Sequence, residues 1–104
     1  MANYMFAYSG GNGVAADKAE RDAQMAKWGQ WFEQLGSAVV DGGAPTGTAK
    51  TVGRAGSVSD GGSRGLTGYS IVAADSLDAA VELAKGCPVL EIGGAVDVYE
   101  AVAM

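Results

Sequence analysis

The alternation of apolar and small residues near the N-terminus predicts a β-strand. From Tyr4 to Tyr8, aromatic side chains at every second position alternate with Met5 and Ala7. A period of two residues places Tyr4, Phe6 and Tyr8 on one face of a strand. The segment from Ser9 to Ala16 is rich in glycine and alanine, and we expect a loop there.

The next segment has the spacing of an amphipathic helix. Asp17 is a typical N-cap residue, and Glu20 follows three positions later, as in a capping box. Apolar residues then recur three and four positions apart on one expected buried stripe: Met25, Trp28, Phe32 and Leu35. Trp31 flanks this stripe, and Gly36 is a natural stop. We therefore predict a helix from Lys18 to Leu35.

The middle of the chain predicts shorter elements. A strand through Ala38, Val39 and Val40 is expected to break at Gly42-Gly43-Ala44-Pro45. The stretch from Thr46 to Ser59 alternates small, polar and β-branched residues, which favours a hairpin turning at Ala55-Gly56. Asp60-Gly61-Gly62-Ser63 is expected to form another loop.

The last third predicts a strand, a helix and a strand. From Thr67 to Ala74, Tyr69, Ile71 and Ala73 alternate with Ser70, Val72 and Ala74. Asp75 or Ser76 would cap a second helix, which Gly86-Cys87-Pro88 ends. Its expected buried stripe consists of Leu77, Ala80, Val81 and Ala84. A final strand covers Ala95 to Val102.

This order of elements predicts one α+β domain over residues 1–104. A βαββαβ chain with an inserted hairpin fits the ferredoxin-like arrangement, an antiparallel sheet with both helices on one face. The predicted strands carry apolar residues on both faces, as at Tyr69 and Ile71 against Val72. Helices can cover one face, so we expect a second copy of the chain to cover the other. The expected assembly is a homodimer through sheet faces.

Composition removes several classes of function. The net charge is −5 and the basic residues are scattered, so neither nucleic acid nor an anionic membrane is an expected partner. The chain has no histidine and a single cysteine, Cys87, so we expect no disulfide, no metal site and no histidine general base. Without a recognisable signal segment or a long apolar run, the expected location is the cytoplasm.

One glycine motif permits two interpretations. Gly11-Asn12-Gly13-Val14-Ala15-Ala16 matches the first part of a dinucleotide-binding fingerprint, between a predicted strand and a predicted helix. The helix is expected to start after the glycines, and Asp41 lies farther along than the usual acidic partner. We favour a loop and expect no cofactor.

The segment Gly68 to Pro88 carries the most specific motif of the chain, together with the opening strand, Lys50-Thr51-Val52 and Val58-Ser59-Asp60-Gly61. This order resembles the YCII-related family of the DGPF type over nearly the whole chain. The resemblance implies a dimeric α+β barrel, related in fold to small cofactor-free monooxygenases and muconolactone isomerase-like proteins. It also implies a pocket between sheet and helices, near the dimer interface.

Five side chains are candidates for such a pocket. Asp60 is the candidate general base, although Asp-Gly is also a common turn. Arg54 could pair with a substrate carboxylate, or be a solvated surface residue. The hydroxyls of Tyr8 and Tyr69 could face a ligand or find backbone partners, and Trp31 could line the pocket or pack in the core. Cys87 is expected to be a small buried hydrophobe.

Two functional hypotheses follow. The first is a small-molecule pocket protein, with oxygenase or isomerase chemistry suggested by fold analogy. The second is a non-catalytic dimeric binding or regulatory module. The missing histidine and the short loop after Asp60, where Gly62 stands in place of the subgroup's Pro-Phe, favour the second. The expected pocket favours the first, which we prefer, without assigning it a reaction.

Overall fold

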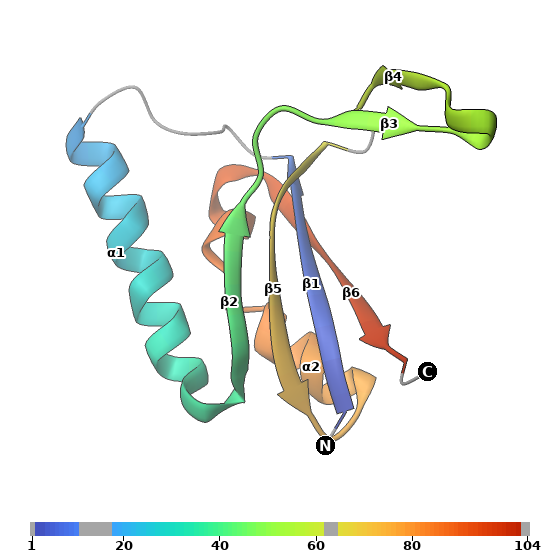
Figure 1. Cartoon of the computed structure of the whole chain (residues 1–104). Helices are drawn as coiled ribbons and strands as arrows, with labels where there is room; N and C mark the ends of the chain where they lie inside the picture. The colour runs from blue at the N-terminus through green and yellow to red at the C-terminus, as the bar shows by residue number, and fades with distance from the viewer. Residues whose placement is uncertain (1, 11–17, 62–64, 103–104) are drawn as a thin grey trace.

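The structure, a computed structural model, describes residues 2–10, 18–61 and 65–102 (Figure 1). Four strands form the main sheet: β1 (Ala2–Gly10), β2 (Val39–Pro45), β5 (Leu66–Ala74) and β6 (Gly94–Ala101). Their order is β2-β5-β1-β6, and each neighbouring pair is antiparallel. The predicted α+β class and antiparallel sheet are confirmed. The glycine motif at 11–16 and the Asp17 cap lie outside the described residues.

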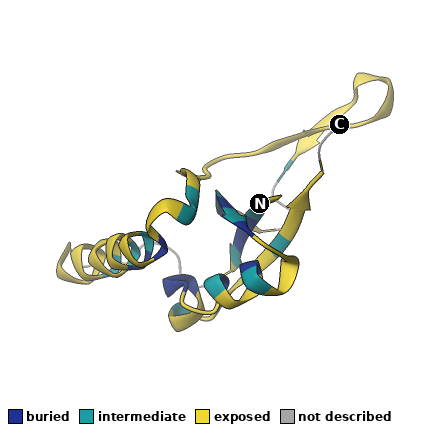
Figure 2. Cartoon of the chain, turned by 90° about the horizontal axis from the view of Figure 1, so that it is seen from below, coloured by how far each residue is buried: buried dark blue, intermediate teal, exposed yellow. Residues whose placement is uncertain are grey.

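One face of the sheet carries the core. Tyr4 lies opposite Val72, and Phe6 lies opposite Ser70 on one side and Val98 on the other, so these side chains share a face. The core cluster joins this face to both helices and to the segment after the second helix: Tyr4, Phe6, Tyr8, Trp31, Leu35, Val72, Ala74, Ala80, Ala84, Cys87 and Val89. Figure 2 shows the buried residues gathered where sheet and helices meet.

Helix α1 (Lys18–Leu35) has the predicted bounds, and three residues of its predicted stripe, Trp28, Phe32 and Leu35, belong to the core or pack against it. Trp31 and Leu35 are its buried residues, and the Trp31 ring stacks on Phe6 with centroids 6.1 Å apart. Met25, expected in the core, is 73% exposed. Met25 is exposed because α1 stands beside β2 and the N-terminal half of the helix extends away from the sheet (Figure 1).

Helix α2 (Leu77–Ala84) begins at the predicted cap, where the Ser76 hydroxyl accepts a hydrogen bond from the Ala79 N–H at 3.1 Å. Ala80 and Ala84 are buried, as expected, but Leu77 is 46% exposed. The alanines face the sheet, and the larger side chains of the stripe line a shallow groove beside β6 instead. The chain then forms an unpredicted 3₁₀ helix, η3 (Pro88–Ile92).

Strand β2 continues through the glycines that were expected to end it. Its pairing with β5 shifts register on both sides of Asp41, which marks bulges in the strand. Gly43 adopts a φ of 74°, and a Cβ atom there would collide with the Tyr69 carbonyl oxygen. Its N–H donates to the Asp41 carboxylate at 2.8 Å. Glycine thus lets the strand bend rather than stop.

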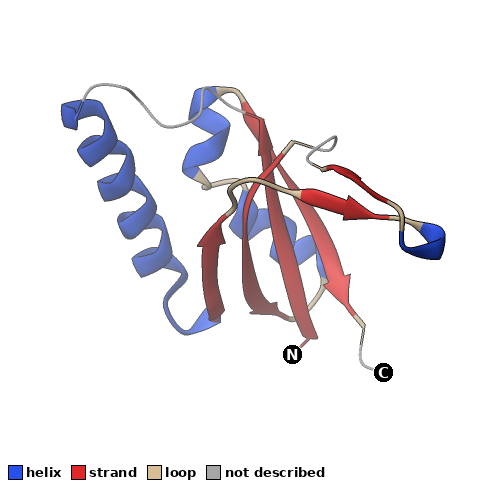
Figure 3. Cartoon of the chain, turned by 45° about the horizontal axis from the view of Figure 1, so that its top comes forward, coloured by secondary structure: helices blue, strands red, loops and turns tan. Residues whose placement is uncertain are grey.

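The predicted hairpin is confirmed as a separate two-stranded sheet, β3 (Lys50–Val52) and β4 (Val58–Asp60). The 3₁₀ turn η2 (Arg54–Gly56) joins them at the expected place, with Ala55 at a φ of 63°. Asp60 ends a strand rather than lying in a loop. Figures 2 and 3 show the hairpin projecting from the main sheet on the side opposite α2.

Candidate functional site

The five predicted site residues lie in three separate places. Tyr8 and Trp31 belong to the core between the sheet and the helices. Arg54 and Asp60 lie on the projecting hairpin. Tyr69 is half-buried on β5, on the sheet face that the helices do not cover. Within one chain, therefore, these side chains do not converge on a common pocket.

Tyr8 donates the first of two consecutive hydrogen bonds that begin in the core. Its hydroxyl donates to the Ser70 hydroxyl at 2.8 Å, and Ser70 donates to the Gly42 carbonyl oxygen at 2.7 Å. Burial raises the pKa of Tyr8 well above its usual range, more than the hydrogen bond to Ser70 lowers it. Tyr8 therefore stays neutral and ties three strands together, β1, β5 and the bulge of β2.

Trp31 lies in the middle of an aromatic cluster on α1 and β1. Its ring centroid is 5.7 Å from that of Trp28, 5.2 Å from that of Phe32 and 6.3 Å from that of Tyr8. The indole N–H donates to the Leu83 carbonyl oxygen at 3.2 Å. Trp31 thus connects α1 with the end of α2, a role that the helical spacing did not reveal.

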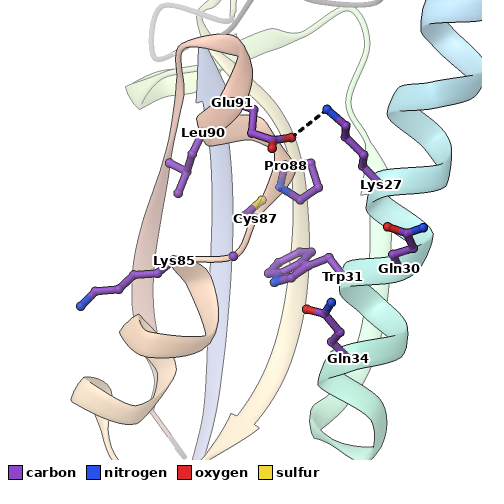
Figure 4. A pocket seen from close by; sticks show the side chains of 10 residues that line it. Lys27, Gln30, Trp31, Gln34, Lys85, Cys87, Pro88, Leu90 and Glu91 are labelled. Atoms are coloured by element: carbon purple, nitrogen blue, oxygen red, sulfur yellow. Dashed lines mark ion pairs between the residues drawn. The ribbon is translucent and has the colours of Figure 1, made fainter.

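A groove of about 490 Å³ lies between α1 and the segment that follows α2 (Figure 4). Its walls combine an aromatic ring, two amides, two lysines and a thiol: Lys27, Gln30, Trp31, Gln34, Lys85, Gly86, Cys87, Pro88, Leu90 and Glu91. An ion pair of 3.3 Å between Lys27 and Glu91 spans it. The Lys85 side chain turns away and pairs with Glu82 at 2.8 Å. The groove is mixed in polarity and near neutral in charge.

Cys87 lies at the base of this groove and is 2% exposed. Burial raises the pKa of its thiol to about 11, although a backbone hydrogen bond from Val89 acts in the opposite direction. A thiol protonated at neutral pH is a poor nucleophile. The prediction of a small buried hydrophobe is confirmed.

Asp60 and Arg54 are surface residues of the hairpin. The Asp60 side chain is 91% exposed, and its carboxylate accepts a hydrogen bond from Lys50 Nζ at 2.6 Å. Arg54 is exposed in the turn that joins the two strands. An exposed ion pair of this kind contributes little to stability, so Asp60 has no structural role that explains its position in one chain.

The uncovered side of the sheet forms the third region. Met5 lies opposite Ile71 on one neighbouring strand and Tyr99 on the other, and Ala7 lies opposite Tyr69. We call this surface the open face, and its apolar residues are Met5, Ala7, Tyr69, Ile71, Ala73 and Tyr99. Tyr99 is 53% exposed. Apolar side chains on both faces were expected from the strand pattern, and the structure has them.

Among the described residues, no three His, Cys, Asp or Glu side chains are grouped so that they could hold a metal ion. Neither helix, in the part of the chain that the structure describes, is long and apolar enough to cross a bilayer. No protein family and no curated protein matches the chain.

Proposed function

We propose that this chain is a non-catalytic binding module that works as a homodimer, with a ferredoxin-like subunit of the YCII-related, DGPF type. The two open faces meet in this dimer. The sheet order β2-β5-β1-β6, with antiparallel pairs throughout, supports the ferredoxin-like subunit. The resemblance of Gly68 to Pro88 supports the family.

The amount of exposed surface carries the dimer proposal. A compact monomer of 10.4 kDa is expected to expose about 5,400 Å². This chain exposes 7046 Å², an excess of about 1,600 Å². A standard interface buries about 800 Å² on each partner, so the excess, which the open face shares with the projecting hairpin and the exposed half of α1, leaves room for one.

The positions and hydrogen-bond partners of the candidate catalytic side chains favour binding over catalysis. General acid–base chemistry needs side chains that converge on one reacting atom. Tyr8 is held by Ser70 inside the core, and Asp60 is paired with Lys50 on the hairpin. Cys87 stays protonated at neutral pH because it is buried.

Sedimentation velocity at tens of micromolar tests this proposal, and the expected species is a dimer. Tyr99→Asp places a charge on the open face, at a side chain exposed enough for the fold to tolerate it, and should give a monomer. Met25→Asp, at a more exposed apolar residue on α1, is the matched control and should stay dimeric. A monomeric wild-type protein would refute the dimer.

A small-molecule pocket is the second candidate, and the groove beside Trp31 favours it. Its volume of about 490 Å³ lies within the range of ligand sites, roughly 300–1,000 Å³. Native mass spectrometry of the freshly purified protein should then detect a retained mass, and Gln30→Leu with Gln34→Leu should abolish it. An unmodified chain mass in both proteins would count against this candidate.

A further inference from the structure

The hairpin with its connecting residues, 46–60, makes an exposed arm that is tied to the main sheet at its base, where Thr46 donates hydrogen bonds to the carbonyl oxygens of Thr67 and Leu66. Every residue of the arm is exposed, including Val52 at 70% and Val58 at 65%. Its strands pair with each other alone, in a sheet separate from the main one. A two-stranded hairpin without a covering layer is marginally stable in water.

The side chains of the arm divide between its two faces. Val52 lies opposite Val58, and Lys50 lies opposite Asp60. Because positions 50 and 52 share one face of a strand, the valine pair and the ion pair lie side by side there. The other face carries the polar pair Thr51 and Ser59. One face of the arm therefore carries an apolar pair next to the turn and an ion pair beside it, a combination of apolar and charged groups that also occurs at interfaces.

The direction of the arm takes it toward the side where a second copy would lie. It leaves the sheet from the ends of β2 and β5 and projects on the side opposite α2, which is the side of the open face (Figures 2 and 3). A fully extended chain from Thr46 to Arg54 would span at most roughly 25 Å, whereas two stacked sheets lie about 10 Å apart. The arm is therefore long enough to contact the body of a copy that faces the sheet.

The exposed area is also larger than one sheet face needs. The excess of about 1,600 Å² is twice what a partner contributes to a standard interface of about 800 Å². The open face is one surface that a dimer can cover. The arm, exposed along its whole length, is another such surface, and the N-terminal half of α1 is a third.

We infer that each arm clasps the second copy of the chain, with Val52 and Val58 packed against the partner subunit. This inference rests on the proposed dimer, and adds a contact that the meeting of open faces does not require. It also gives Lys50 and Asp60 a role, because their ion pair then lies at the rim of an interface.

Photo-crosslinking tests the contact directly. A benzophenone amino acid in place of Val52 should give a covalent dimer on a denaturing gel, with the crosslink mapped by mass spectrometry to the partner. The same group in place of Met25, which is 73% exposed on α1, should give no dimer band. A crosslink within the same chain, or none at all, would overturn the inference.

Sedimentation equilibrium measures the contribution of the contact. Val52→Asp with Val58→Asp should weaken the dimer at least tenfold, because two apolar side chains would be replaced by buried charges. Thr51→Asp with Ser59→Asp adds the same charge to the opposite face and should change the dissociation constant less than threefold. Equal effects of the two double variants would contradict a specific contact through the valines.

The two proposals fail in different ways. A monomeric wild-type protein would remove both. A dimer that Tyr99→Asp dissociates, but that Val52→Asp with Val58→Asp leaves unchanged, would keep the open-face dimer and reject the arm. A Val52 crosslink to an unrelated protein in a lysate, with none to the partner subunit, would also reject it.

Discussion

Ser70 is a polar side chain in the middle of an apolar core, with none of its surface exposed. Its hydroxyl uses both of its capacities, accepting from Tyr8 and donating to Gly42. Among the described residues, every buried side-chain nitrogen and oxygen atom has a partner. A buried network of this kind is stabilising only while each member is satisfied.

Removing Ser70 should therefore cost more than removing the hydroxyl of Tyr8. Ser70→Ala leaves the buried Tyr8 hydroxyl without its acceptor and removes the hydrogen bond to the carbonyl oxygen of the exposed Gly42, at about 2 kcal/mol of unfolding free energy. Tyr8→Phe leaves one acceptor lone pair unused, at about 1 kcal/mol. Urea denaturation of both variants measures the difference. Equal losses would mean that the Gly42 carbonyl oxygen finds another partner.

The buried thiol should make stability fall at alkaline pH. The pKa of Cys87 is raised from 9.0 to about 11 in the folded chain, so the unfolded chain loses this proton first. The stabilisation is complete below pH 9 and is lost as the pH rises toward 11, with a slope of at most about 1.4 kcal/mol per pH unit.

Denaturation curves at successive pH values test this. Cys87→Ala should flatten the decline just above pH 9, while Tyr8, whose pKa is also raised, still lowers stability at higher pH. The same slope in the wild type and in Cys87→Ala would show that the thiol is not its source.

At the scale of elements, α2 depends on one capping residue. The Ser76 hydroxyl accepts from the Ala79 N–H, one of the helix donors without a partner inside the helix. Ser76→Ala should cost about 1 kcal/mol, and Ser76→Asp should keep most of the stability because aspartate also caps. Thermal unfolding of both variants measures this, and an equal loss in both would argue against capping.

The bend of β2 depends on Gly43. Gly43→Ala would force a Cβ atom into the Tyr69 carbonyl, and should break the pairing of β2 with β5. Gly36 also has a positive φ, but a Cβ atom at that position would meet nothing within 4 Å, so Gly36→Ala should cost about 1–2 kcal/mol. Hydrogen exchange of β5 amides distinguishes local opening from global destabilisation, and similar protection in both variants would contradict this account.

At the scale of the whole molecule, charge opposes the proposed dimer. Each chain carries a net charge of −5, so two chains repel each other when they meet. Salt screens this repulsion and leaves apolar contact intact. We expect the dimer to tighten roughly two- to fivefold between low and high salt, measured by sedimentation equilibrium. A dimer that salt weakens would instead be held by ion pairs.

The shape of the molecule is also a property of the whole. The chain measures 44 × 42 × 19 Å with a radius of gyration of 15.0 Å, against about 13 Å expected for a compact domain of this length. The arm and the free half of α1 account for this extension (Figure 1). Both features depend on where elements end relative to the sheet, which no local pattern specifies.

Local patterns by themselves determined most of the elements. Alternation predicted β1, β5 and β6, helical spacing and Gly36 set the bounds of α1, and the turn residues predicted the hairpin. These features depend on side-chain periodicity and on backbone preferences, which act over a few residues. They needed no knowledge of the partners that each segment meets.

The tertiary structure alone decided which side of an element is buried and which residues meet. Helical spacing counted Met25 as core and Trp31 as its flank, but the sheet ends before it can cover Met25. One pocket was expected to hold Asp60, Tyr8 and Tyr69, whereas the hairpin, the core and the open face keep them apart. Such distances depend on how far each strand extends and on how the chain bends at Gly43, and packing between distant segments fixes both.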